Sequence, residues 1–66
     1  MRKIFPRPTR YYTRFAISIH AAPDSNSERI DLLKMGTFVW IEFIEDGWGK
    51  LSGRPGFVKM DYITIA

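Results

Sequence analysis

The stretch Phe-Val-Trp-Ile-Glu-Phe-Ile at residues 38–44 decides the fold, because every residue in it except Glu42 is aromatic or β-branched. Such side chains fit a pleated, half-buried surface and are enriched in strands. Glu-Asp-Gly follows at residues 45–47, and Asp-Gly between apolar runs is a strong signal for a tight hairpin turn. Trp-Gly-Lys-Leu at residues 48–51 supplies a returning strand. The sequence therefore predicts a β-hairpin over residues 38–51.

Short strands are also expected on both sides of this hairpin. Phe15, Ile17 and Ile19 alternate with smaller or polar residues, which is the period of two that characterises a strand. Loops containing Gly, Pro, Ser and Asn separate the apolar runs. Further strands are predicted at residues 28–34, 57–58 and 63–65, and one tight helical turn at residues 59–62. The pattern predicts an all-β fold, a small five-stranded barrel over residues 15–66.

Charge divides the chain into two parts. Residues 1–14 carry five cations and no acid, whereas residues 15–66 carry five cations and seven acids, so +5 and −2 give the net charge of +3. This asymmetry predicts a basic N-terminal arm of residues 1–14, rich in Pro, Arg and Tyr, on a barrel of residues 15–66. The cations of the arm are Arg2, Lys3, Arg7, Arg10 and Arg14.

Two interpretations of the arm are open. Pro6 and Pro8 favour an extended backbone, and arginines interleaved with aromatic residues can bind phosphates and stack on bases. The nucleic-acid-binding residues would then be Arg2, Lys3, Arg7, Arg10, Tyr11, Tyr12 and Arg14. In the favoured alternative, the arm adds to the sheet, buries Ile4, Phe5 and Tyr12, and leaves its arginines in solvent.

The strand at residues 38–44 has an unusual outer face. If Val39, Ile41 and Phe43 point into the core, alternation turns Phe38, Trp40, Glu42 and Ile44 outward. Adjacent exposed aromatic residues are uncommon on a monomer, so we expect this face to be covered. The arm is the favoured cover. A second copy of the chain in a homodimer and a partner protein anchored on Trp40 are the alternatives.

The residues do not favour an enzyme. The chain has 66 residues and therefore one domain at most, with no cysteine for a nucleophile, a disulfide or a thiolate zinc site. His20 is the only histidine, and on the face opposite Ile17 and Ile19 it is expected to face solvent or pack on a loop. Glu45 and Asp46 would point apart in the hairpin turn. No residues have metal-ligand spacing. We expect no catalytic residue, no metal site and no cofactor.

The N-terminus gives no sign of export or membrane insertion. Met1, Arg2 and Lys3 could open a signal peptide, but Pro6 and Pro8 interrupt the apolar segment that a signal requires. No apolar run is long enough to span a membrane. The sequence predicts a cytoplasmic protein without membrane partners.

Four motifs in order resemble a known family. They are Ile-Ser-Ile-His-Ala-Ala-Pro at residues 17–23, Leu-Lys-Met-Gly-Thr at 33–37, Gly-Trp-Gly-Lys-Leu at 47–51 and Gly-Phe-Val-Lys-Met-Asp-Tyr-Ile at 56–63. Together they resemble bacterial SH3-like domains, and the resemblance covers residues 15–65. It implies an SH3-like barrel that binds cell-wall peptides, other proteins or metabolites. Trp48 and Tyr62 resemble family positions at the edge of the barrel. Trp48 is expected to be a half-buried core residue, and a groove shared with Tyr62 is the alternative.

Three departures from the family pattern fall at or near the loops. His20 replaces the usual Arg, Ala22 the usual Gly, and Phe57 the usual Trp. Loops are where such domains vary and bind, so the departures concern the ligand more than the fold.

The function expected from these observations is non-catalytic protein binding, as an adaptor or as a small inhibitor of a partner protein. The partner-binding residues would be Phe38, Trp40, Ile44, Trp48 and Tyr62. Nucleic-acid binding through the arm is one alternative. Recognition of peptidoglycan peptides is the other, and it would suit a phage protein released at cell lysis.

Overall fold

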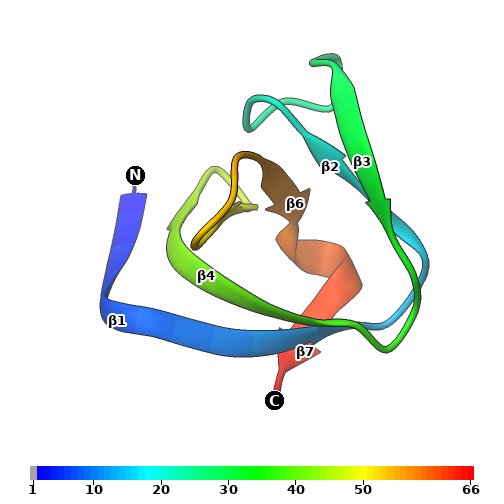
Figure 1. Ribbon diagram of the computed structural model, residues 1–66. Helices are drawn as coiled ribbons and strands as arrows, with labels where there is room; N and C mark the ends of the chain where they lie inside the picture. The colour runs from blue at the N-terminus through cyan, green and yellow to red at the C-terminus, as the bar shows by residue number, and fades with distance from the viewer. Residues whose placement is uncertain (1) are drawn as a thin grey trace.

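The computed structural model describes residues 2–66 as a single curved β-sheet (Figure 1). Its seven strands are all antiparallel and lie in the order β3-β2-β6-β5-β4-β1-β7. One turn of 3₁₀ helix, η1, precedes the last strand. The elements are β1 (Arg2–Thr13), β2 (Ile17–His20), β3 (Arg29–Leu33), β4 (Phe38–Glu45), β5 (Trp48–Leu51), β6 (Phe57–Lys59), η1 (Met60–Tyr62) and β7 (Ile63–Ile65).

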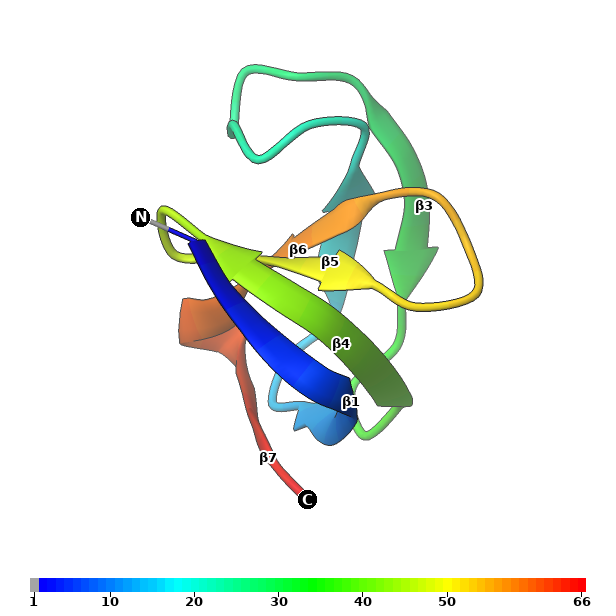
Figure 2. The same cartoon turned by 90° about the vertical axis from the view of Figure 1, so that its left-hand side faces the viewer.

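The all-β prediction is confirmed, but the prediction of a closed five-stranded barrel is wrong. The sheet has seven strands, and its end strands, β3 and β7, do not pair with each other. The additional pairing comes from β1, which lies between β4 and β7. Figure 2 shows β1 and β4 running side by side. The basic segment is therefore a strand of the sheet over residues 2–13, and Met1 lies outside the described residues.

Proline is accommodated in β1 by an interruption of the ladder. Pairing with β4 covers Arg2 to Ile4 and resumes at Thr9, with a register shift between the two parts. Pro6 and Pro8 lie in this gap. Since proline has no amide N–H to donate, a gap in the ladder is where a paired strand tolerates it.

The predicted hairpin of β4 and β5 is confirmed. Asp46 and Gly47 connect the strands, and both have positive φ angles, 51° and 81°. A two-residue turn with two positive φ values matches the right-handed twist of the flanking strands. Glycine adopts this conformation without steric cost, which explains Gly47 at the second position.

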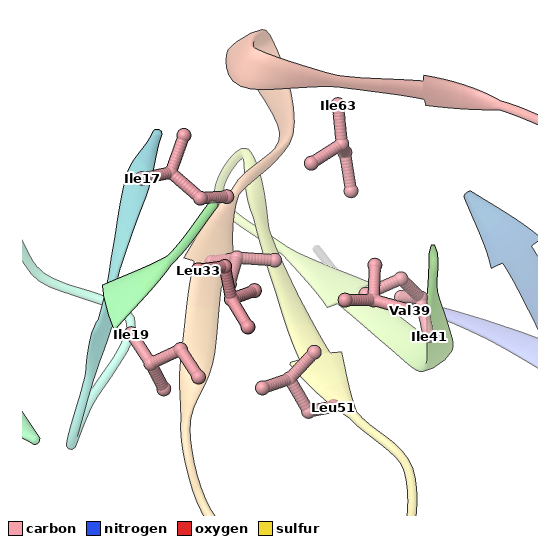
Figure 3. Close-up of a cluster of buried hydrophobic side chains, with 8 residues drawn as sticks. Ile17, Ile19, Leu33, Val39, Ile41, Leu51 and Ile63 are labelled. Carbon is pink, nitrogen blue, oxygen red and sulfur yellow. The ribbon is translucent and has the colours of Figure 1, made fainter. Parts of the chain in front are cut away.

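One hydrophobic cluster fills the concave side of the sheet (Figure 3). Val39 and Ile41 of β4 are buried, as predicted. They meet apolar residues from β2, β3, β5, β6 and β7. The cluster consists of Ile17, Ile19, Leu33, Val39, Ile41, Leu51, Val58 and Ile63.

The predicted orientations of Phe43 and Ile44 are wrong, because a bulge reverses the alternation in β4. The register between β4 and β5 shifts between Ile41 and Phe43. Beyond the shift, Ile44 lies opposite Gly49, whose α-carbon faces the Ile41 side chain, and Ile44 packs against the core. Phe43 lies opposite Lys50 and turns to the convex side. An extra residue in one strand has this consequence because side chains alternate with a period of two.

The predicted burial of Ile4, Phe5 and Tyr12 in the basic segment is correct only for Phe5. Phe5 packs against the core, but Ile4 is 69% exposed and Tyr12 40% exposed. Tyr11 contacts the core in place of Tyr12. The gap after Ile4 determines which side chains in the second half of β1 point toward the core, and no local pattern in the sequence reveals this gap.

Thr13 fastens the end of β1 to the turn before β4. It is the one buried polar residue among the described residues, with its Oγ1 donating to the Lys34 carbonyl at 2.7 Å. The same oxygen accepts the amide N–H of Thr37 at 2.9 Å. Its own backbone pairs with the amide of Gly36 and the carbonyl of Thr37. The side chain therefore links two backbone groups of this turn. The Lys34 carbonyl also accepts the Thr37 hydroxyl, whereas the Thr37 amide donates to Thr13 Oγ1.

Candidate binding groove

A groove of about 480 Å³ lies on the convex side of the sheet, over β2, β5 and β6. Aromatic rings form much of its wall, from Phe15, His20, Trp48 and Tyr62. Ser18, Ser25 and Lys59 add polar groups. An apolar concave surface with a few convergent polar groups is the usual form of a ligand site.

Strand alternation places these residues outside the core. Ile17 and Ile19 of β2 face the core, so Ser18 and His20 face outward. Gly49 faces the core, which turns Trp48 to the convex side, opposite Lys59 of β6. The outward side chains of β2, β5 and β6 thus form part of the groove, and Phe15, Ser25 and Tyr62 join them from the segment before β2, the loop after it and η1.

The rings in the groove hold each other in place. The rings of Phe15 and Tyr62 meet edge to face, with centroids 6.0 Å apart. His20 and Trp48 do the same at 5.2 Å. Edge-to-face pairs are a favoured aromatic arrangement, and each adds about 0.5–1.5 kcal/mol beyond its burial. Trp48 is 8% exposed, although it lies outside the core cluster.

Hydrogen bonds fix the loop at one side of the groove. His20 Nδ1 lies 3.1 Å from the Ser27 carbonyl oxygen. Because a carbonyl can only accept, Nδ1 carries the proton in this contact, and a neutral imidazole then presents an acceptor at Nε2. Ser27 Oγ donates within the same loop to the Asp24 carbonyl at 2.6 Å and lies 3.1 Å from that of Ala22. The groove is therefore largely preformed.

The five residues predicted to bind a partner are divided among three places. Trp48 and Tyr62 line the groove, and Ile44 packs against the core. Phe38 and Trp40 lie instead on the convex face of β4, where they are 54% and 48% exposed.

We call the surface of Arg10, Tyr12, Phe38 and Trp40 the outer face of β1 and β4. Arg10 is the register partner of Trp40, and Tyr12 is the partner of Phe38, so the four side chains share one side of the sheet. The rings of Tyr12 and Phe38 meet edge to face at 6.5 Å. The arm was expected to cover this face, but it lies beside β4 and leaves Phe38 and Trp40 half exposed.

The remaining cations predicted to bind nucleic acid are scattered. Arg2 forms an ion pair with Glu45 at 2.8 Å and lies over the Phe43 ring. Arg14 lies 5.8 Å from the centre of the Phe15 ring at the groove, and Lys3 lies 5.6 Å from that of Phe5. Arg7 is exposed, and Tyr11 packs against the core. Of the predicted set, only Arg10 and Tyr12 join the exposed rings of β4.

Of the groove residues, sequence reasoning selected only Trp48 and Tyr62. It missed the other two rings of the wall, Phe15 and His20. Phe15 was expected to continue the strand of Ile17 and Ile19, but β2 begins at Ile17 and Phe15 reaches Tyr62 instead. His20 was expected to face solvent or pack on a loop, and its contacts with Ser27 and Trp48 follow the second expectation. The alternation that exposes His20 was a usable signal, whereas the Phe15–Tyr62 contact joins residues distant in the sequence.

The clearest electrostatic perturbation lies away from the groove. Asp31 of β3 accepts the backbone N–H of Leu32 and a 2.7 Å bond from Arg54, and these contacts lower the pKa of its carboxyl. Residues 2–66 contain no cluster of three or more His, Cys, Asp or Glu side chains that could hold a metal ion. No helix within them is long and apolar enough to cross a membrane.

Comparison with known proteins does not identify a family. No family model matches the chain, and neither a curated protein nor a solved structure shows significant similarity to it. Function must therefore be inferred from the geometry of the groove and of the outer face of β1 and β4.

Proposed function

We propose that this chain is a non-catalytic binding module that holds a short, extended segment of another protein in the groove over β2, β5 and β6. The observation that carries the proposal is the wall of Phe15, His20, Trp48 and Tyr62 around about 480 Å³ of open space. Preformed aromatic grooves bind extended and proline-containing segments with little loss of conformational entropy.

The groove also defines the chemistry of the bound segment. Its apolar residues would pack against Tyr62 and Trp48, which line the same groove. Ser18 and Ser25 offer hydroxyl groups to the peptide backbone. Lys59, whose Nζ lies 5.9 Å from the centre of the Tyr62 ring, makes no ion pair within residues 2–66 and would favour an acidic side chain beside the apolar ones.

We also propose that the curved sheet is an SH3-like barrel of the bacterial type. The order of the four motifs supports this, as does a 3₁₀ turn directly before the last strand. In that fold, Trp48 and Tyr62 correspond to positions at the barrel edge, in keeping with a groove there. A cytoplasmic location and the absence of catalysis belong to the same proposal.

Selection from a phage-displayed library of random peptides tests the proposal. An enriched peptide is then synthesised and titrated by calorimetry against the native chain, Tyr62→Ala and Tyr12→Ala. These tyrosines form a matched pair, since they are 42% and 40% exposed but lie on different surfaces. We expect Tyr62→Ala to weaken binding at least about tenfold and Tyr12→Ala to leave it unchanged.

Two results would contradict peptide binding in the groove. One is a library that yields no enriched peptide. The other is an equal loss of affinity in both tyrosine variants. Sedimentation with purified peptidoglycan distinguishes the cell-wall alternative: Tyr62-dependent sedimentation without any enriched peptide would favour that ligand over a protein segment.

A further inference from the structure

The outer face of β1 and β4 presents three aromatic side chains on one surface. Tyr12 and Phe38 are direct neighbours across the strand pair, and Trp40 lies two residues farther along β4. Each ring is between 40% and 54% exposed. The groove lies over β2, β5 and β6, so this surface is separate from the peptide site proposed above.

One cation, Arg10, lies among these rings. The guanidinium of Arg10 lies 5.0 Å from the centre of the Phe38 ring, on the same face as Trp40. Arg10 makes no ion pair within residues 2–66, and neither do Lys3, Arg7 and Arg14. The two carboxylates of β4 are each paired with a cation, Glu42 with Lys50 and Glu45 with Arg2. β1 itself contains no acidic residue.

We propose that the outer face of β1 and β4 binds single-stranded nucleic acid. Tyr12, Phe38 and Trp40 would stack on successive bases, and Arg10 would contact the phosphate backbone. Aromatic side chains on an open sheet, flanked by cations, suit any base because every base has a π-face.

The observations favour a nucleic acid over an acidic protein. A protein partner anchored on aromatic residues usually receives them in well-packed pockets that exclude water. Here the rings lie on an open strand pair, and Arg10, opposite Trp40 and 5.0 Å from the centre of the Phe38 ring, makes no ion pair within residues 2–66. This arrangement suits alternating bases and phosphates. The positive charge of residues 1–14, with five cations and no acid, would also attract a nucleic acid over a longer range.

The test measures fluorescence anisotropy of labelled oligothymidylate and oligouridylate of about 15 nucleotides, since single-strand sites span about 4–16 nucleotides. The native chain is compared with Trp40→Ala, Phe38→Ala and Arg10→Ala. Tyr62→Ala is the aromatic control, on the groove. Arg29→Ala is the charge control, since it removes one exposed cation from β3. Circular dichroism verifies that each variant is folded.

We expect binding at low salt, weakened about tenfold or more by Trp40→Ala and by Phe38→Ala. Arg10→Ala should reduce the slope of log K against log salt by about 0.7, the value for one phosphate contact on a single strand. Tyr62→Ala should have no effect, and Arg29→Ala should leave the slope unchanged. The two oligonucleotides distinguish DNA from RNA as the preferred strand.

Several outcomes would overturn the proposal. Binding of neither oligonucleotide at low salt would do so. Equal losses in Arg10→Ala and Arg29→Ala with no loss in Trp40→Ala would indicate unspecific charge attraction. A polyglutamate peptide that competes as well as the oligonucleotide would assign the face to an acidic protein. A dimer that sedimentation detects and Trp40→Ala dissociates would assign it to a second copy of the chain.

Discussion

The groove and the outer face of β1 and β4 use the same residue types in opposite ways. In the groove, Trp48 is 8% exposed, and its ring meets that of His20 edge to face. On the outer face, Trp40 is 48% exposed and has only Arg10 as its cross-strand neighbour. Loops, rather than strand composition, therefore make a binding cavity on this sheet. A recessed ring can select a shape, whereas an exposed ring offers a flat surface to many partners.

The two tryptophans should therefore differ most in their effect on stability. We expect Trp48→Ala to lower the free energy of unfolding by about 3–5 kcal/mol, the range for a buried large aromatic residue. Trp40→Ala should lower it by about 1 kcal/mol or less, because its side chain loses little packing. A domain of this size is stable by roughly 3–5 kcal/mol, so Trp48→Ala is expected to be close to unfolding.

Urea unfolding followed by circular dichroism measures both variants. Trp48→Phe is the control, since it keeps an aromatic ring against His20 and should be more stable than Trp48→Ala. Similar losses for Trp48→Ala and Trp40→Ala would remove the distinction between a recessed and an exposed surface.

Thr13 affects the stability of the outer face, because it supports β1, which carries part of that face. Thr13→Val keeps the shape of the side chain but removes the bonds to the Lys34 carbonyl and the Thr37 amide. Leaving the Thr37 amide without its partner should cost about 1–3 kcal/mol, while the Lys34 carbonyl keeps the Thr37 hydroxyl. Thr13→Ser retains the hydroxyl and should recover most of the loss. Thermal unfolding that is unchanged in Thr13→Val would show that these bonds do not hold β1.

The pH dependence of stability should show the smallest effect, at the edge strand β3. The backbone N–H of Leu32 and the guanidinium of Arg54 lower the pKa of Asp31 from its ordinary value of 3.8. A carboxyl with a lowered folded-state pKa stabilises the fold above its unfolded pKa, and this contribution is lost as pH falls through the folded value.

Asp31→Asn should remove that part of the acid sensitivity. Because Asp31 is exposed, the difference between the native chain and this variant is expected to be slight. Urea unfolding at neutral pH and below pH 3.8 measures it. A native chain that gains stability relative to Asp31→Asn on acidification would contradict the assignment.

The sequence predicts local features of this fold better than pairings between distant segments. The β4–β5 hairpin and the inward facing of Val39 and Ile41 follow from composition, turn chemistry and alternation within a few residues. The exchange of Phe43 and Ile44 does not, because the bulge depends on the register with β5. The packing of Tyr11, rather than Tyr12, against the core does not follow from these local features either, because it depends on the interruption of the β1 ladder.

The candidate site shows the same limit. Trp48 and Tyr62 could be selected by resemblance, and they do line one groove. Trp40 and Phe38 could be selected by alternation, but their separation from the groove is a property of the sheet order. Phe15 joins the groove through a contact with Tyr62, 47 positions along the chain, that no local pattern contains.

The central claim is that the recessed aromatic groove, and not the outer face of β1 and β4, is the peptide site. The most direct measurement is a nuclear magnetic resonance titration of the isotope-labelled chain with the peptide enriched from the library. We predict the largest chemical-shift changes at the Trp48 indole and at the amides of Ser18, His20 and Lys59, with little change at Arg10 and Trp40. Changes concentrated at Arg10, Tyr12 and Trp40, with an unperturbed Trp48 indole, would contradict the account.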